Sequence, residues 1–129
     1  MNSKEKGDIT ETQILARLVR FGYKVLIPWG DNSRYDLVID EEGKFSRIQC
    51  KTGRLRNGCV LYNTSSVNRE GIKTGYENQA EFFGVYCKEI DKCYLVPVKG
   101  SPKGYASIRI NKTKSNQKKK IKWAKDYEI

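Results

Sequence analysis

The sequence predicts an α/β fold in which an N-terminal helix packs on a mixed, mostly antiparallel sheet, followed by a basic C-terminal extension. Apolar residues recur at helical spacing near the N-terminus. Several short apolar runs separated by turn-forming residues follow, which is typical of strands. The 129 residues suffice for one ordinary hydrophobic core but not for two full-sized units. We therefore expect a single domain over residues 1–129.

The expected helix runs from Asp8 to Phe21. It carries four apolar residues at helical spacing, Ile14, Leu15, Leu18 and Val19. The run "DITE" at residues 8–11 has the form of an N-terminal capping box, and Gly22 is expected to end the helix. These signals together predict about four helical turns.

The first strands are expected to include a tight hairpin. The run "YKVLIP" at residues 23–28 is a short apolar strand, which Pro28 and the turn-rich "WGDNS" bring to an end. Residues 34–40 and 44–52 alternate in a manner typical of strands, and "DEEG" lies between them. The pattern predicts an antiparallel hairpin.

The rest of the chain predicts further strands and one loop. Residues 58–64 are expected to form a strand, while segments 81–87 and 93–98 flank the turn "KEIDK" as a second hairpin. The run "YASIRI" at 105–110 adds an edge strand. Residues 65–79 are polar and contain two glycines, so we expect a loop holding at most one helical turn.

The chain carries a strong excess of positive charge. It has 25 Lys and Arg against 15 Asp and Glu, a net charge of +10, so a polyanion is the expected partner. A membrane surface is the other candidate, but no run approaches the roughly 18 apolar residues of a membrane span. The start "MNSKEKGDIT" lacks the apolar stretch of a signal peptide. We expect a cytoplasmic protein with no membrane partner.

The residue types present exclude several kinds of chemistry. The sequence contains no histidine, so neither a Ser-His-Asp triad nor an imidazole general base can form. Its four cysteines include no CxxC pair, and we expect reduced, mostly buried thiols rather than zinc ligands. An enzyme built from this chain would depend on carboxylates, amides, lysine and a metal ion.

Polar side chains gather on the predicted first hairpin. Because side chains alternate along a strand, Gln49 and Lys51 project to one side, while Ile48 and Cys50 project towards the core. Asp36 is expected to lie across the hairpin from residues 47–49. An acid, an amide and an amine therefore share one corner.

One helix residue is a candidate for the same corner. Glu11 precedes Leu15 by four residues and Leu18 by seven, so it lies on their inward-facing side of the helix. A simpler interpretation is that Glu11 only caps the helix and that the hairpin charges only face solvent. The hypothesis of a site depends on all four polar residues occurring together.

Three stretches resemble the PD-(D/E)XK nucleases, and most closely their small group I intron-encoded homing endonucleases. They are "GDITETQILARLVRFGYKVLIPWGDNSRYDLVID", "RIQCKTGR" and "NQKKKIKWAKDYEI". Archaeal Holliday-junction resolvases are similar over the same core. The resemblance implies a restriction-endonuclease-like core in which Asp36 is the motif aspartate and Lys51 the motif lysine. Gln49 then occupies the position of the second acid, and Glu11 is the helix glutamate.

The sequence departs from the family pattern at two positions. Tyr35 stands where the name-giving proline would be, which has little consequence. Gln49 replaces an acid, and an amide offers one neutral oxygen where a carboxylate offers charge. The replacement implies weaker metal binding, compensation by Glu11, or a protein that binds without cutting. We favour compensation by Glu11, since the most similar relatives resemble this chain in having glutamine here.

The resemblance implies a Mg²⁺-dependent DNA endonuclease. Asp36, Glu11 and the backbone carbonyl of Cys50 would hold the ion beside the side-chain oxygen of Gln49. Lys51 would steady the nucleophilic hydroxide and the charge that builds on the phosphate. A Holliday-junction resolvase is the alternative enzyme, and a catalytically lapsed basic nucleic-acid-binding module is the alternative from another class.

The expected partner is double-stranded DNA. Basic residues interleaved with Tyr76, Tyr105 and Trp123 suit a surface that follows phosphates, and counterion release would make binding strong and salt-sensitive. The candidate DNA-binding residues are Arg54, Arg56, Arg69, Lys73, Lys118, Lys119 and Lys120. Because one small domain covers about one turn of duplex, we expect a homo-oligomer, a dimer or a tetramer.

Overall fold

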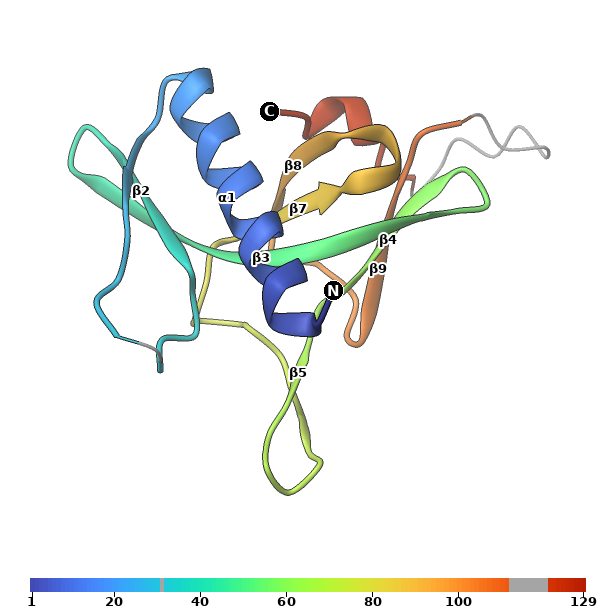
Figure 1. Ribbon diagram of the computed structural model, residues 1–129, viewed down its shortest axis with the longest axis horizontal. Helices are drawn as coiled ribbons and strands as arrows, with labels where there is room; N and C mark the ends of the chain where they lie inside the picture. Colours follow the sequence, from blue (N-terminus) through green and yellow to red (C-terminus); the bar gives the residue numbers. More distant parts are fainter. Residues whose placement is uncertain (31, 112–120) are drawn as a thin grey trace.

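The computed structural model describes residues 1–30, 32–111 and 121–129, and one long strand, β3 (Lys44–Arg56), crosses its whole width (Figure 1). The helix α1 (Ser3–Phe21) lies against one face of the sheet. The other elements are β1 (Lys24–Leu26), β2 (Leu37–Glu41), β4 (Cys59–Asn63), β5 (Ser66–Val67), β6 (Lys73–Thr74), β7 (Phe82–Cys87), η1 (Lys88–Ile90), β8 (Lys92–Pro97), β9 (Tyr105–Arg109) and η2 (Ala124–Asp126).

The sheet is mixed and mostly antiparallel, which confirms the predicted fold class. Strand β3 pairs in parallel with β7 and antiparallel with β2 and β4. The pairs β1–β2, β4–β9 and β7–β8 are antiparallel as well. Both predicted hairpins are present, and β9 lies at the edge of the sheet beside β4, as expected for "YASIRI".

The helix α1 begins five residues earlier than the sequence predicted. The Asn2 side chain accepts a hydrogen bond from the Glu5 N–H, and the Glu5 carboxylate accepts one from the Asn2 N–H. The predicted capping box starting at Asp8 was therefore wrong, because the earlier pair already caps the N-terminal N–H groups. Gly22 ends the helix with φ of 107°, as predicted. Glu11 consequently lies inside the helix and has no capping role. Within the described ranges, no helix combines the length and apolarity needed to cross a membrane.

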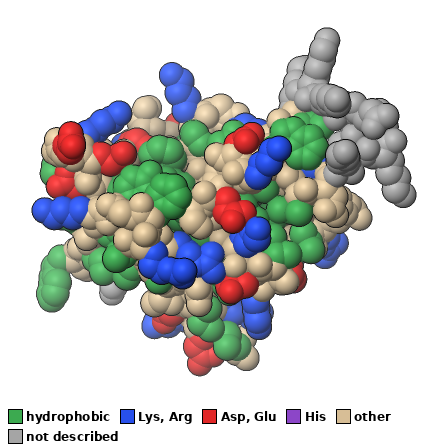
Figure 2. Space-filling model, turned by 90° about the horizontal axis from the view of Figure 1, so that it is seen from above, with side chains coloured by type: hydrophobic (Ala, Val, Ile, Leu, Met, Phe, Trp, Pro, Cys, Tyr) green, Lys and Arg blue, Asp and Glu red, His purple; other side chains and the backbone are tan. Residues whose placement is uncertain are grey.

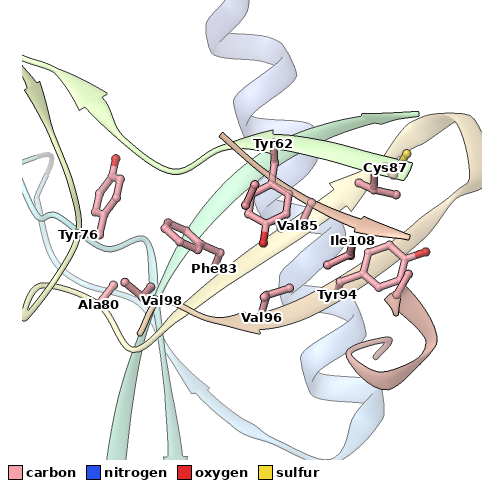
Figure 3. Packing of buried hydrophobic residues seen from close by; sticks show 13 residues of the cluster. Tyr62, Tyr76, Ala80, Phe83, Val85, Cys87, Tyr94, Val96, Val98 and Ile108 are labelled. Atoms are coloured by element: carbon pink, nitrogen blue, oxygen red, sulfur yellow. The ribbon is translucent and has the colours of Figure 1, made fainter. Parts of the chain in front are cut away.

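Two hydrophobic clusters lie on opposite faces of the sheet. Strand β7 contributes to both because its side chains alternate, Phe83 and Val85 facing one cluster and Tyr86 the other. The cluster beneath α1 consists of Ile14, Leu18, Leu37, Ile39, Ile48, Tyr86, Cys93 and Leu95. Figure 3 shows the second cluster, in which aromatic and aliphatic side chains from β4, β7, β8 and β9 meet. The sheet is therefore covered on both faces where β3 and β7 run side by side.

Gly84 on β7 allows α1 to approach the sheet closely. A Cβ atom at this position would lie 2.9 Å from Cγ2 of Ile14 and 3.1 Å from Cγ2 of Ile48. We expect Gly84→Ala to lower the free energy of unfolding by about 1–3 kcal/mol, because overpacking forces the neighbouring side chains to shift. Urea unfolding measures the change, with Gly75→Ala as the control, since nothing lies within 4 Å of a Cβ there. Equal stability of the two variants would contradict the close packing.

Arg47 on β3 and Glu81 just before β7 form a bidentate ion pair. The guanidinium donates to the carboxylate from Nη2 at 2.5 Å and from Nε at 3.0 Å. The Arg47 N–H also donates to Oε1 of Glu81 at 2.7 Å, and the Glu81 N–H donates to the Arg47 carbonyl at 2.9 Å. These bonds hold the start of β7 beside β3. The hydrogen bond from Arg47 lowers the pKa of the Glu81 carboxyl from its ordinary value of 4.5.

Glu81→Gln is expected to lower the free energy of unfolding at neutral pH by about 1 kcal/mol, because both partners are more than a third exposed and water screens the pair. A carboxyl whose pKa is lowered by folding supplies stability above its ordinary pKa, and this stability is lost as the pH falls through the lowered value. The difference from wild type should therefore shrink below pH 4.5. Urea unfolding across this range tests the sign, with the exposed Glu77→Gln as control. A deficit independent of pH would contradict the ion pair.

Within segment 65–79, where the sequence predicted a loop, residues 66–74 form a small hairpin that projects from the body of the molecule (Figure 1). Ser66 pairs with Thr74 and Val67 pairs with Lys73. The Asn68 side chain accepts hydrogen bonds from the N–H groups of residues 70 and 72 and shapes the turn. Every residue of this segment is described, and it contains no α-helix. We call residues 65–76 the β5–β6 arm.

Candidate active site

Strand β3 has one edge that its neighbours leave open at the centre of the molecule. On this edge β2 pairs with β3 as far as Leu37 opposite Ile48, and β4 pairs with it from Leu61 opposite Arg54. Between these points, residues 49–53 have no strand partner on this edge within the described part of the chain. Their other edge pairs with β7. The gap forms a fork between β2 and β4, which Figure 1 shows above the β5–β6 arm.

Asp36 fills the start of this fork. Its N–H donates to the Ile48 carbonyl at 2.8 Å, and its Oδ2 accepts a hydrogen bond from the Cys50 N–H at 2.9 Å. Because the N–H and C=O of one strand residue point to the same edge, the Cys50 carbonyl also faces the fork. Extending the β2–β3 register by one residue places Asp36 opposite Gln49. The Asp36 carboxylate and the Cys50 carbonyl therefore face the same gap, and Gln49 lies opposite Asp36 in the register.

The helix brings Glu11 to the same fork. The preceding residue, Thr10, is 3% exposed, and its hydroxyl lies 2.6 Å from the hydroxyl of Thr52 on β3. This hydrogen bond fixes the helix against the strand beside Glu11. The Glu11 carboxylate is half-buried and close enough to Asp36 for the two charges to influence each other.

Burial raises the pKa of both carboxyl groups. Desolvation raises the pKa of Asp36 above its ordinary value of 3.8, although the Cys50 N–H and the charge of Lys51 act in the opposite direction. Desolvation also raises the pKa of Glu11 above 4.5, and the negative charges of Asp36 and Asp8 add to this effect. Burial, Asp36 and Glu11 together raise the pKa of the Cys50 thiol, which stays protonated. The site therefore concentrates negative charge in a partly desolvated place.

Lys51 lies on the opposite face of β3 from α1 and reaches the base of the β5–β6 arm. Its ammonium donates to the Ser65 carbonyl at 3.4 Å and to the Tyr76 hydroxyl at 3.2 Å. It is close enough to Asp36 to oppose the rise in the pKa of that carboxyl. Lys51 therefore lies near Asp36, on the face of β3 to which the alternation also assigns Gln49.

The structure separates the predicted DNA-binding residues into two groups. Arg54 and Arg56 are exposed at the end of β3, and the alternation of that strand puts them on the face of Thr52 rather than that of Lys51. Arg69 and Lys73 are exposed on the β5–β6 arm. The predicted cluster Lys118, Lys119 and Lys120 lies outside the described residues.

The sequence analysis missed the positions of two residues at the site. Tyr76 was expected on a phosphate-following surface, which was wrong, because it is 4% exposed and packs in the hydrophobic cluster of Figure 3. Arg34 precedes Asp36 by two residues, and its guanidinium lies 4.2 Å from the centre of the Tyr76 ring. Neither belongs to a periodic pattern, so only their contacts with distant segments reveal them.

The donor atoms at the fork suit a hard cation. Carboxylates, an amide oxygen and a backbone carbonyl are the oxygen ligands that Mg²⁺ prefers. Over the described ranges, no three His, Cys, Asp or Glu side chains converge. A cation here would therefore depend on Gln49 and the Cys50 carbonyl as well as on Asp36 and Glu11. Both acids have raised pKa values, because their charged forms are disfavoured by burial and, for Glu11, by the charge of Asp36. A bound cation would relieve this repulsion between the carboxylates.

A helix that carries one acid packs on a mixed sheet, and the central strand of this sheet carries a lysine near a second acid. This arrangement defines the class of restriction-endonuclease-like nucleases. The family model described as PD-(D/E)XK endonuclease matches residues 1–129, and the chain belongs to this family.

A solved structure that is named as an endonuclease agrees with this assignment. The chain resembles the structure of a bacterial homing endonuclease, I-Ssp6803I, with a TM-score of 0.78 and 25% identity, covering 99% of this chain and 89% of that one. It is also 24% identical over 110 residues to protein 5.3 of Escherichia phage T7, covering 82% of this chain and 88% of that protein.

Proposed function

We propose that this protein is a Mg²⁺-dependent endonuclease that hydrolyses phosphodiester bonds in double-stranded DNA at specific sites, as an intron-encoded homing endonuclease. The observation that carries this proposal is the convergence at the β3 fork. There the Asp36 carboxylate accepts a hydrogen bond from the Cys50 N–H. Glu11 and Lys51 both lie close enough to Asp36 for their charges to interact with it. The family and the likeness to a homing endonuclease support the same reaction class.

Each residue of the fork has a distinct role in the proposed mechanism. Asp36, Glu11 and the Cys50 carbonyl would hold Mg²⁺, which would polarise the phosphate and lower the pKa of an attacking water. The Lys51 ammonium supplies fixed positive charge next to the phosphate as negative charge develops on its oxygens. The Cys50 N–H fixes one oxygen of Asp36, so the carboxylate keeps its orientation when the other oxygen binds a ligand.

Gln49 leaves the proposed site one negative charge short of the usual family pattern. The Glu11 carboxylate has no capping role and supplies charge from the helix side. Its pKa is raised first by burial and then by the nearby charge of Asp36. This arrangement supports compensation by Glu11 over a lapsed site. The Gln49 side-chain oxygen remains as a neutral ligand.

Double-stranded DNA is the proposed substrate, bound by a homo-oligomer. The net charge of +10 and the exposed Arg54, Arg56, Arg69 and Lys73 support contacts with phosphates. Figure 2 shows basic side chains spread over one face with acidic and hydrophobic ones among them. One domain reaches about one turn of duplex, so two or four copies would read a longer site. Analytical ultracentrifugation with and without DNA measures the number of copies.

The proposed function is tested with three DNA substrates and a titration of Mg²⁺. Supercoiled plasmid, a linear duplex library and a four-way junction are incubated with the purified protein, and EDTA is the control. Cleavage of duplex DNA at discrete positions that requires the metal is the expected result. Cleavage confined to the junction would make the protein a resolvase instead. Salt-sensitive binding with no product under Mg²⁺ or Mn²⁺ would make it a binding module.

A further inference from the structure

Two cations lie close to the Tyr76 ring. The Lys51 ammonium lies 4.7 Å and the Arg34 guanidinium 4.2 Å from the centre of this ring. The ring also packs edge-on against Phe83, with 5.8 Å between centroids and planes at 90°. Because Tyr76 is 4% exposed, water competes little with these contacts. The ring is held by the core on one side and presents its π-electrons and hydroxyl to Lys51.

Within the described part of the chain, both hydrogen-bond acceptors of Lys51 come from the β5–β6 arm. The Ser65 carbonyl lies at the start of the arm and the Tyr76 hydroxyl at its end, 3.4 and 3.2 Å from the ammonium. A lysine side chain has four rotatable bonds and loses much conformational entropy when it is fixed. Two acceptors and an aromatic face from one element therefore determine where this ammonium rests.

Arg34 fixes the same element from the other direction. Its guanidinium donates to the Ser66 hydroxyl, to the Gly75 carbonyl at 2.9 Å and to the Gln79 side chain. These partners lie at both ends of the arm and just beyond it. Arg34 also belongs to the segment that leads into Asp36, so it joins the arm to the acidic side of the fork.

We propose that Tyr76 is a positioning residue that holds the Lys51 ammonium at the fork, with Arg34 holding Tyr76. The proposal rests on the proposed function in so far as Lys51 acts on the phosphate. Tyr76 itself does not touch the substrate. Because Tyr76 belongs to the β5–β6 arm, the position of the Lys51 ammonium depends on how the base of this arm is folded. Tyr76 contributes a ring face, which favours an ammonium electrostatically, and a hydroxyl oxygen that accepts its hydrogen bond.

The geometry is tested without reference to cleavage. In ¹³C-labelled protein, the ring current of Tyr76 should displace the Lys51 side-chain NMR signals from those of exposed lysines. Tyr76→Phe should keep most of this shift and Tyr76→Leu should abolish it. Tyr62→Phe is the matched control, because Tyr62 is also buried against Phe83, whereas the hydrogen bonds and the aromatic contact that the described residues make with Lys51 come from Ser65 and Tyr76. An unchanged Lys51 signal in folded Tyr76→Leu would overturn the proposal.

The consequence for catalysis is tested by single-turnover cleavage at saturating DNA. Tyr76→Phe should slow the reaction about tenfold, the effect of one lost hydrogen bond to a charged group, and Tyr76→Leu should slow it further. DNA affinity in Ca²⁺ should stay within about twofold for both, which a general loss of structure would not allow. Wild-type rates in both Tyr76 variants would overturn the proposal. If wild type cuts no DNA, the proposed function fails, and the NMR result alone decides whether Tyr76 positions Lys51.

Discussion

Asp36→Asn is expected to abolish DNA cleavage while leaving DNA binding close to that of wild type. Asparagine keeps an oxygen that can accept the Cys50 N–H bond, so the fork should retain its shape. The change removes the negative charge that would hold Mg²⁺, and several kcal/mol of transition-state stabilisation with it. Such a loss slows the reaction by a factor of about 1,000 or more. Plasmid cleavage under Mg²⁺ and duplex binding under Ca²⁺ measure the two effects separately.

The control for this variant is an acid of the same hairpin that lies away from the fork. Glu41 is exposed at the end of β2, where it pairs with Lys44 beside the turn, and Glu41→Gln should cut DNA at the wild-type rate. Cleavage by purified Asp36→Asn at a rate near wild type would remove this carboxylate from the mechanism. Loss of binding in parallel with cleavage would show instead that the substitution disturbs the fold.

Lys51→Ala should also eliminate most of the activity. It removes the fixed positive charge next to the phosphate, and loss of one such group typically slows an enzyme about 100- to 1,000-fold. It also leaves the Ser65 carbonyl and the Tyr76 hydroxyl without their lysine donor, so thermal unfolding must be recorded beside the cleavage rate. Lys88→Ala, at an exposed position of η1, is the matched control.

The two active-site substitutions should differ in their response to the metal. Asp36→Asn weakens binding of the ion, so a higher Mg²⁺ concentration should recover part of its activity. Lys51→Ala leaves the proposed ligands in place, and added Mg²⁺ should recover nothing. Equal recovery in both would contradict the separate roles of acid and lysine.

The parts of the site that lie close together along the chain were predictable. The hairpin of β2 and β3 depends on the short turn at residues 42–43 and on the alternation of side chains, which are local properties of the sequence. They placed Asp36 across the hairpin from residues 47–49 and put Lys51 on the same side of the strand as Gln49. Glu11 followed from helical spacing, even though the predicted start of the helix was wrong.

The parts that depend on distant segments were not predictable. Tyr76 looked like a surface aromatic because polar residues flank it, and only the folded chain buries it against Phe83. Arg34 makes its contacts with residues more than 30 positions further along the chain. The β5–β6 arm consists of two-residue strands, too short for alternation to show. The pattern of a single sequence shows the periodicity of a segment, but not which distant segment packs against it.

The parallel pairing of β3 with β7 has a consequence for the order in which the enzyme becomes active. This pairing joins residues more than 30 positions apart, so it closes a long loop and should form late in folding. Asp36 and Cys50 can meet in an early hairpin, but Tyr76 is seated only when Phe83 on β7 has docked. A newly synthesised or partly folded chain would thus bear its acids with the lysine unrestrained. Such a chain should lack full cleavage activity until β7 has docked against β3.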